Sequence, residues 1–253
     1  MRSLVLSGGA FRGAAQLPVI EHLMQQHEYN YIYGVSVGAI NGAMVAQEKV
    51  LELRRMWENI DSIGGFLKLK WYWPFKGIYS MHPLREKIER LVSLKDIKIP
   101  LSVGLVSLTD QNYYHLHTKS MMYDYELWDA IHASSSIKGL MVSPSIQIKG
   151  TNHYGADGGF RNGIPIPPRR GETNAIDIIS CVPLRTKDNA SIDVLNGTIT
   201  KEDIKALVSA HPGAKITLYN PLVNLGPSFL ANPKTIKWRM HQGELMIKNP
   251  ITV

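Results

Sequence analysis

The residues with the clearest chemical potential lie at 34–38, where the sequence reads Gly-Val-Ser-Val-Gly. Ser36 stands between two glycines with the G-x-S-x-G spacing of a nucleophile elbow. In such an elbow the serine occupies a tight turn between a strand and a helix, and the glycines remove Cβ atoms that would clash. The flanking sequence fits, because the apolar run at 31–35 predicts a buried strand and the run at 39–47 predicts a helix.

A second glycine-rich turn, Ser7 to Gly13, follows the apolar strand expected at the start of the chain. It precedes a helix expected at 14–26, so its backbone N–H groups would face an anion at a helix N-terminus. That anion is either the phosphate of a nucleotide or the oxyanion of an acyl-transfer transition state. The turn lacks the G-x-G-x-x-G spacing of dinucleotide sites, and the second strand ends in Ser36 rather than in an acidic residue, which favours the oxyanion.

A serine hydroxyl becomes a good nucleophile only when a neighbouring base accepts its proton. Of the nine histidines, only His211 and His241 follow Asp157 and could complete a Ser–Asp–His order. Asp157 itself ends a short predicted strand and precedes Gly158 and Gly159, so its carboxylate could lie at a strand end close to other backbone. Both a histidine-dependent and a histidine-free base remain open on this evidence.

The elements that must position these residues alternate between strands and helices. Further strands are expected at 101–108, 113–118, 145–149, 152–156, 175–182 and 214–219. Further helices are expected at 49–60, 82–92, 125–135 and 201–209, and one at 235–247 interrupted by Gly243. No repeat or low-complexity linker divides the chain, so we predict a single domain over residues 1–253.

The segment at 66–81 combines aromatic rings with lysines. Such residues suit either the surface of an anionic membrane or single-stranded nucleic acid, and a loop folded over its own domain would also contain them. The membrane interpretation would use five side chains, Lys68, Lys70, Trp71, Trp73 and Lys76.

The composition narrows the class of protein. The formal net charge of +7 favours an anionic partner, and the single cysteine, Cys181, excludes an internal disulfide. No Cys/His cluster has zinc spacing, so no metal site is expected. We find no secretory signal and no apolar stretch long enough to cross a bilayer, which predicts a cytoplasmic protein with peripheral membrane contact at most.

Three motifs in this order, SGGAFRG at 7–13, GVSVG at 34–38 and DGG at 157–159, resemble those of patatin-like phospholipases. The sequence between them is also similar, including KGIYSMHPLREKIERLV and LWDAIHASSSI, and the similarity extends over roughly residues 1–183. The resemblance implies an α/β fold of three layers, with a mostly parallel central sheet flanked by helices.

The resemblance also implies a catalytic dyad of Ser36 and Asp157 that needs neither histidine nor a cofactor. Its site residues would be Gly8, Gly9, Ala10, Arg12 and Gly13 for the oxyanion hole, with Gly34, Gly38, Gly158 and Gly159 supporting the elbow and the aspartate. Ala10 departs from the family's glycine run. An alanine there keeps its N–H, but the hole would be strained if the position requires a positive φ.

The expected activity is therefore hydrolysis of fatty-acyl esters of phospholipids, without a nucleic-acid partner. Transfer of the acyl group to another alcohol through the same dyad remains an alternative, because the sequence does not say which acceptor enters. A non-catalytic anion- or nucleotide-binding module built on Gly8–Gly13 is the alternative from a different class.

Overall fold

Strands and helices alternate along the chain, and the computed structural model describes them at residues 1–69, 78–166, 173–184 and 199–253. The strands of the main sheet are β1 (Arg2–Leu6), β2 (Tyr31–Val35), β5 (Leu101–Ser107), β6 (Tyr113–His117), β7 (Ser145–Ile148), β8 (Thr151–Asp157), β9 (Ala175–Ile179), β10 (Lys215–Tyr219) and β11 (Ile251–Thr252). The helices are α1 (Gln16–Gln26), α2 (Val37–Ala46), α3 (Val50–Glu58), α4 (His82–Leu91), α5 (Asp124–Ser134), α6 (Lys201–Ala210) and α7 (Pro233–Lys248).

The central sheet has the order β11-β10-β9-β1-β2-β5-β8-β7, with β6 also paired to β5. The five inner strands from β10 to β5 are parallel, and antiparallel strands extend the sheet at both sides. Because parallel strands end at the same edge of a sheet, the turn after β1 and the elbow after β2 lie next to each other.

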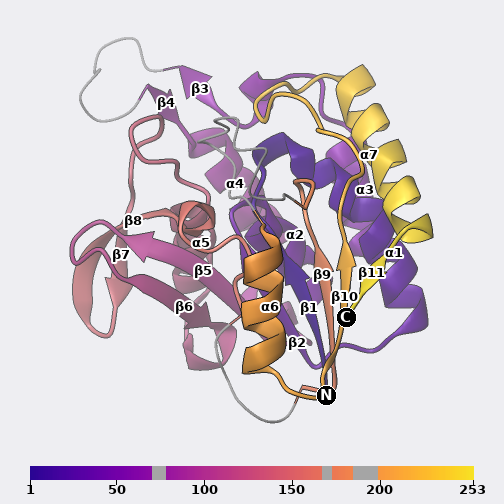
Figure 1. Ribbon diagram of the computed structural model, residues 1–253. Helices are drawn as coiled ribbons and strands as arrows, with labels where there is room; N and C mark the ends of the chain where they lie inside the picture. Colours follow the sequence, from indigo (N-terminus) through magenta and orange to yellow (C-terminus); the bar gives the residue numbers. More distant parts are fainter. Residues whose placement is uncertain (70–77, 167–172, 185–198) are drawn as a thin grey trace.

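Helices cover both faces of the sheet, and β1 shows how. Leu4 and Leu6 point into a core formed with α1, α2, α3, α5 and α7, whereas Val5 points into a smaller core with α6. This alternation is the period of two that a strand imposes on its side chains. Figure 1 shows α6 in front of the sheet. The other helices pack in the larger core on the opposite face of the sheet. The expected three-layer α/β fold is confirmed.

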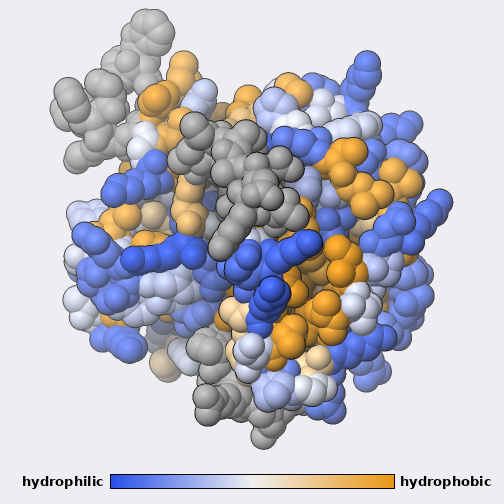
Figure 2. All heavy atoms as spheres, viewed as in Figure 1, coloured by the Kyte–Doolittle hydropathy of each residue, from blue (hydrophilic) through white to orange (hydrophobic). Residues whose placement is uncertain are grey.

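The surface seen from the same side is mostly hydrophilic, but hydrophobic residues gather beside α6 and β11 in Figure 2. Ile251 and Val253 at the C-terminal end are among the exposed hydrophobic residues.

One expected interruption is absent. Helix α7 runs through Gly243 without a break. At this glycine, α7 packs closely on the turn before α1. A Cβ at Gly243 would lie 2.2 Å from the carbonyl oxygen of Ala15 and 3.0 Å from Cδ of Pro18. The glycine therefore serves helix packing and does not end the helix.

Half of the aromatic and basic segment at 66–81, residues 70–77, lies outside the described residues, and it includes Lys70, Trp71, Trp73 and Lys76. Lys68 is exposed in the short strand β3 (Lys68–Leu69), which pairs with β4 (Tyr79–Ser80). The predicted membrane contact therefore remains a prediction. Within the described parts of the chain, none of the helices has the length and apolar character needed to cross a membrane.

Candidate active site

The nucleophile elbow is built where β2 turns into α2. Ser36 has φ 56° and ψ −128°, a strained conformation for a residue other than glycine. The turn is this tight because the helix packs directly on the strands. A Cβ at Gly34 would lie 2.4 Å from the carbonyl oxygen of Gly38, and one at Gly38 would lie 2.2 Å from that of Leu6. The two glycines thus permit the close approach that pushes Ser36 out at the helix N-terminus.

The strand register brings Asp157 to the same place. Val35 of β2 pairs with Gly104 of β5, so Ser36 stands at the level of Leu105. On the other side of β5, Leu105 pairs with Asp157 at the end of β8. Ser36 and Asp157 therefore flank the same residue of one strand, about two strand spacings apart, and their side chains can meet across it.

The Ser36 hydroxyl lies near the Asp157 carboxyl group and favours its charged form. Both residues are buried, each with 6% of its surface exposed. Burial raises the pKa of Asp157 to about 6, although the nearby Ser36 hydroxyl and the hydrogen bond from the Gly159 N–H, which lies 2.7 Å from Oδ1, act in the opposite direction. A carboxylate with this pKa is mostly ionised at pH 7 and is still basic enough to accept a proton.

Ser134, at the end of α5, supports the elbow, and only its place in a run of three serines marks it in the sequence. Its hydroxyl donates to the carbonyl oxygen of Gly104 at 2.6 Å and accepts the Ser36 backbone N–H at 2.8 Å. Ser134 is fully buried. It therefore connects the end of α5 to the elbow after β2 and to β5, the strand that lies between Ser36 and Asp157.

The glycine-rich turn lies against the elbow. A Cβ at Gly8 would be 3.0 Å from the Cβ of Ser36. Among the described residues, no hydrogen-bond partner is found for the N–H groups of Gly8 and Gly9. Ala10 lines the same pocket as Ser36 and has φ 49°, so this position does require the left-handed conformation that disfavours alanine.

The other two residues expected in the oxyanion hole serve different contacts. The backbone N–H of Arg12 donates to the carbonyl oxygen of Gly9, and its buried guanidinium donates to the carbonyl oxygen of Gly226 at 2.7 Å. Gly13 faces α2, where a Cβ would lie 2.4 Å from Cγ2 of Val37. We therefore restrict the candidate oxyanion hole to Gly8, Gly9 and Ala10.

A buried polar network supports this turn, and sequence patterns did not reveal it. The amide of Gln16 donates to the carbonyl oxygens of Ser7 and Ile179, and its oxygen accepts from Asn41. Asn41 in turn accepts the indole N–H of Trp57 at 3.1 Å. A polar residue such as Asn41 within the apolar helix α2 is the only hint of this network in the sequence.

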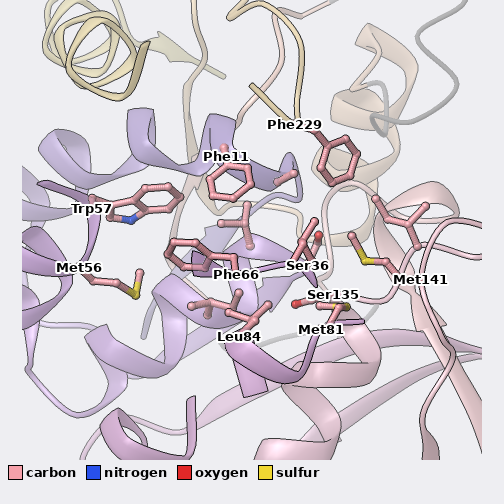
Figure 3. A pocket seen from close by; sticks show the side chains of 15 residues that line it. Phe11, Ser36, Met56, Trp57, Phe66, Met81, Leu84, Ser135, Met141 and Phe229 are labelled. Carbon is pink, nitrogen blue, oxygen red and sulfur yellow. The ribbon is translucent and has the colours of Figure 1, made fainter. Parts of the chain in front are cut away.

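An apolar pocket of about 70 Å³ opens at Ser36. Figure 3 shows Ser36 and Ser135 at its wall, surrounded by hydrophobic and aromatic side chains. They come from distant parts of the chain, among them Phe11, Trp57, Phe66, Met81, Met141 and Phe229. Phe229 belongs to a C-terminal loop that the buried guanidinium of Arg239 holds through the carbonyl oxygens of Leu225, Pro227 and Leu230.

The two histidines that could complete a triad lie elsewhere. His211 ends helix α6, and the exposed His241 bonds Glu244 within α7 at 2.9 Å. Neither lines the pocket at Ser36. The histidine-free pair is therefore the arrangement that the fold brings together.

The chain is similar in sequence to curated proteins. The neuropathy target esterases sws of Drosophila willistoni and Drosophila melanogaster are each 26% identical over 170 residues, which is 64% of this chain and 11% of theirs. The chain thus spans about a tenth of the length of these relatives.

Among solved structures, VipD of Legionella pneumophila aligns with all of this chain and 68% of its own, at 13% identity and a TM-score of 0.47. ExoU of Pseudomonas aeruginosa, in its complex with SpcU, aligns at 15% identity and a TM-score of 0.36, over all of this chain and 53% of its own. A family model for patatin-like phospholipases matches residues 4–169, and the chain belongs to this family.

Proposed function

We propose that the protein is a serine-dependent lipid acyl hydrolase of the phospholipase A type. The observation that carries the proposal is the strand register that brings Ser36 and Asp157 to the same residue of β5, where both are buried. Burial there raises the pKa of the Asp157 carboxyl group to about 6. An apolar pocket at Ser36 supports an acyl chain as the group bound there.

In the proposed reaction, Asp157 accepts the hydroxyl proton while Ser36 Oγ attacks the ester carbonyl carbon. The tetrahedral oxyanion is stabilised by backbone N–H groups of Gly8, Gly9 and Ala10. As the C–O bond to the alcohol breaks, protonated Asp157 returns its proton to the leaving oxygen. Water, deprotonated by Asp157, then attacks the acyl-serine carbonyl carbon. As the bond from that carbon to Ser36 Oγ breaks, Asp157 returns the proton to Oγ and the fatty acid leaves.

The test is release of fatty acid from a diacyl phospholipid in mixed micelles by wild type, Ser36→Ala and Asp157→Asn. Each variant should lose about a thousandfold or more in kcat. Ser62→Ala and Asp61→Asn are matched controls, because both side chains are exposed in the loop after α3, and both should retain full activity. A Ser36→Ala variant within tenfold of wild type would refute the proposal.

The acceptor is settled in the same assay. With glycerol present as a competing alcohol, a hydrolase releases mainly free fatty acid, whereas an acyltransferase forms mainly the new ester. We expect free fatty acid as the main product.

A further inference from the structure

A second cavity, of about 560 Å³, lies beside Asp157 and differs in character from the pocket at Ser36. Its wall includes Asp157, Gln111, Lys138 and Arg161. Ser36 lines one cavity and Asp157 lines the other. Since the two residues flank the same residue of β5, the cavities meet at the reactive pair.

The loop after α5 contributes side chains to both cavities. Ser135, Ile137 and Met141 line the apolar pocket, whereas Lys138 lines the second cavity. The turn after β8 contributes to the second cavity in the same way, because Arg161 follows Asp157 by four residues and lines it as well. An ester bound at Ser36 therefore has an apolar space on one side and a cationic space on the other.

A phospholipid also has an apolar part, the acyl chain, and a charged part, the phosphodiester headgroup. A phosphodiester cannot enter the apolar pocket without a large desolvation cost, since that pocket offers almost no hydrogen-bonding groups. Arg12 does not supply a cation there either, because its guanidinium is buried and bonded to Gly226 and Asn224. The alcohol portion of the substrate, which carries the phosphate, must lie on the Asp157 side.

The charges of the second cavity fit a phosphate. Among the described residues, neither Lys138 nor Arg161 forms an ion pair, and Arg161 donates to the backbone carbonyl of Gln111. With Asp157 on the same wall, the cavity contains two cationic side chains and one carboxyl group. The nearby Asp110 is held by the hydroxyl of Tyr114 and the amide of Asn112. Guanidinium and ammonium groups are the side chains best suited to phosphate oxygens.

We propose that this cavity binds the phosphodiester headgroup of the lipid, with Lys138 and Arg161 as the residues that favour phospholipids over neutral acylglycerols. The proposal rests on the proposed function, since it assigns the part of the substrate that leaves with the alcohol. Ser36 and Asp157 then act on an ester held between the acyl pocket and the headgroup cavity.

The test compares phosphatidylcholine with a diacylglycerol of the same acyl chains, both in neutral detergent micelles. The variant Lys138→Ala/Arg161→Ala is set against Lys205→Ala/Arg90→Ala, which removes the same charge from exposed positions on α6 and α4. We expect the ratio of kcat/KM for phosphatidylcholine to that for diacylglycerol to fall about tenfold in the first variant only, equivalent to about 1.4 kcal/mol. Lys138→Glu alone, which leaves the Arg161 bond intact, should lower the ratio as well.

A binding measurement makes the inference independent of turnover. Ser36→Ala protein is titrated calorimetrically with a short-chain phosphatidylcholine below its micelle concentration, with and without the double substitution, and with glycerol 3-phosphate. We expect the double substitution to weaken phosphatidylcholine binding about tenfold. Tighter or equal binding of glycerol 3-phosphate would mean a site for small phosphate esters and would overturn the headgroup proposal.

The two proposals fail in different ways. If wild type hydrolyses neither lipid but the double substitution weakens phosphatidylcholine binding, the hydrolase proposal fails and the headgroup cavity stands. If both lipids are hydrolysed and the ratio is unchanged by Lys138→Glu and by the double substitution, the headgroup cavity is refuted and the hydrolase stands.

Discussion

Asp157→Asn isolates the free-energy cost of burying the carboxylate that the proposed reaction requires. In the folded protein the pKa of Asp157 is raised from 3.8 to about 6, and burial is the largest cause. A rise of this size corresponds to about 3 kcal/mol of lost stability when the group is ionised in both states. Asparagine has almost the same shape, and its oxygen can still accept the Gly159 N–H.

The direction in which the free energy of unfolding changes with pH follows from proton binding. Between pH 3.8 and about 6 the folded state keeps the Asp157 proton that the unfolded state has lost, so the free energy of unfolding of wild type falls as the pH rises. Above pH 6 the full cost is present, and well below pH 3.8 it is absent. Asp157→Asn should therefore be more stable than wild type by about 3 kcal/mol at pH 7.5, but by only about 0.5 kcal/mol at pH 4.

Urea unfolding at these two pH values measures the difference directly. Asp61→Asn is the control, since it removes one exposed carboxylate, and its effect should be small at both pH values. The reasoning is refuted if Asp157→Asn is no more stable than wild type at pH 7.5, or if its advantage is the same at pH 4. A stabilised but inactive variant is the expected outcome, because a buried charge kept for chemistry weakens the fold.

Three further substitutions test the supports of the site. Ala10→Gly should raise the free energy of unfolding, measured in urea, by up to about 1 kcal/mol, because φ is 49° at this position. The energy that alanine costs in a left-handed conformation outweighs the extra conformational entropy that glycine loses on folding; a loss of stability would contradict this. Ser134→Ala should cost about 1–3 kcal/mol for each buried group left without its partner, the Ser36 N–H and the Gly104 carbonyl, and should slow labelling of Ser36 by a fluorophosphonate; unchanged labelling would argue against positioning. Gly243→Ala should lower the thermal midpoint, because the clash with a backbone carbonyl at 2.2 Å exceeds the roughly 1 kcal/mol gain in helix propensity; an unchanged or higher midpoint would show that α7 can move away.

The sequence predicted the elements around Ser36 well, because their signals are local. Apolar runs, glycine turns and helical spacing mark β1, β2 and α2 within a few residues of their observed ends. The three ordered motifs also predicted the family, which the match over residues 4–169 confirms.

Contacts between distant parts of the chain were harder to predict. Gly243 looked like a helix break because its contact partner, Ala15, is more than two hundred residues away in the sequence. The sign of φ at Ala10 depends on how the turn packs under the elbow, and residue type alone leaves it open. Phe229 in the apolar pocket at Ser36 belongs to the C-terminal part, where the family resemblance ends.

The most direct test of the account is the pH dependence of fluorophosphonate labelling, followed by intact-protein mass. We predict one adduct on wild type and none on Ser36→Ala, with a labelling rate that rises about tenfold from pH 5 to pH 7 as Asp157 ionises around pH 6, and is flat above pH 8. Asp157→Asn should label at least a hundredfold more slowly at pH 7. An Asp157→Asn protein that labels at the wild-type rate, with the same pH profile, would contradict the claim that Asp157 is the base for Ser36.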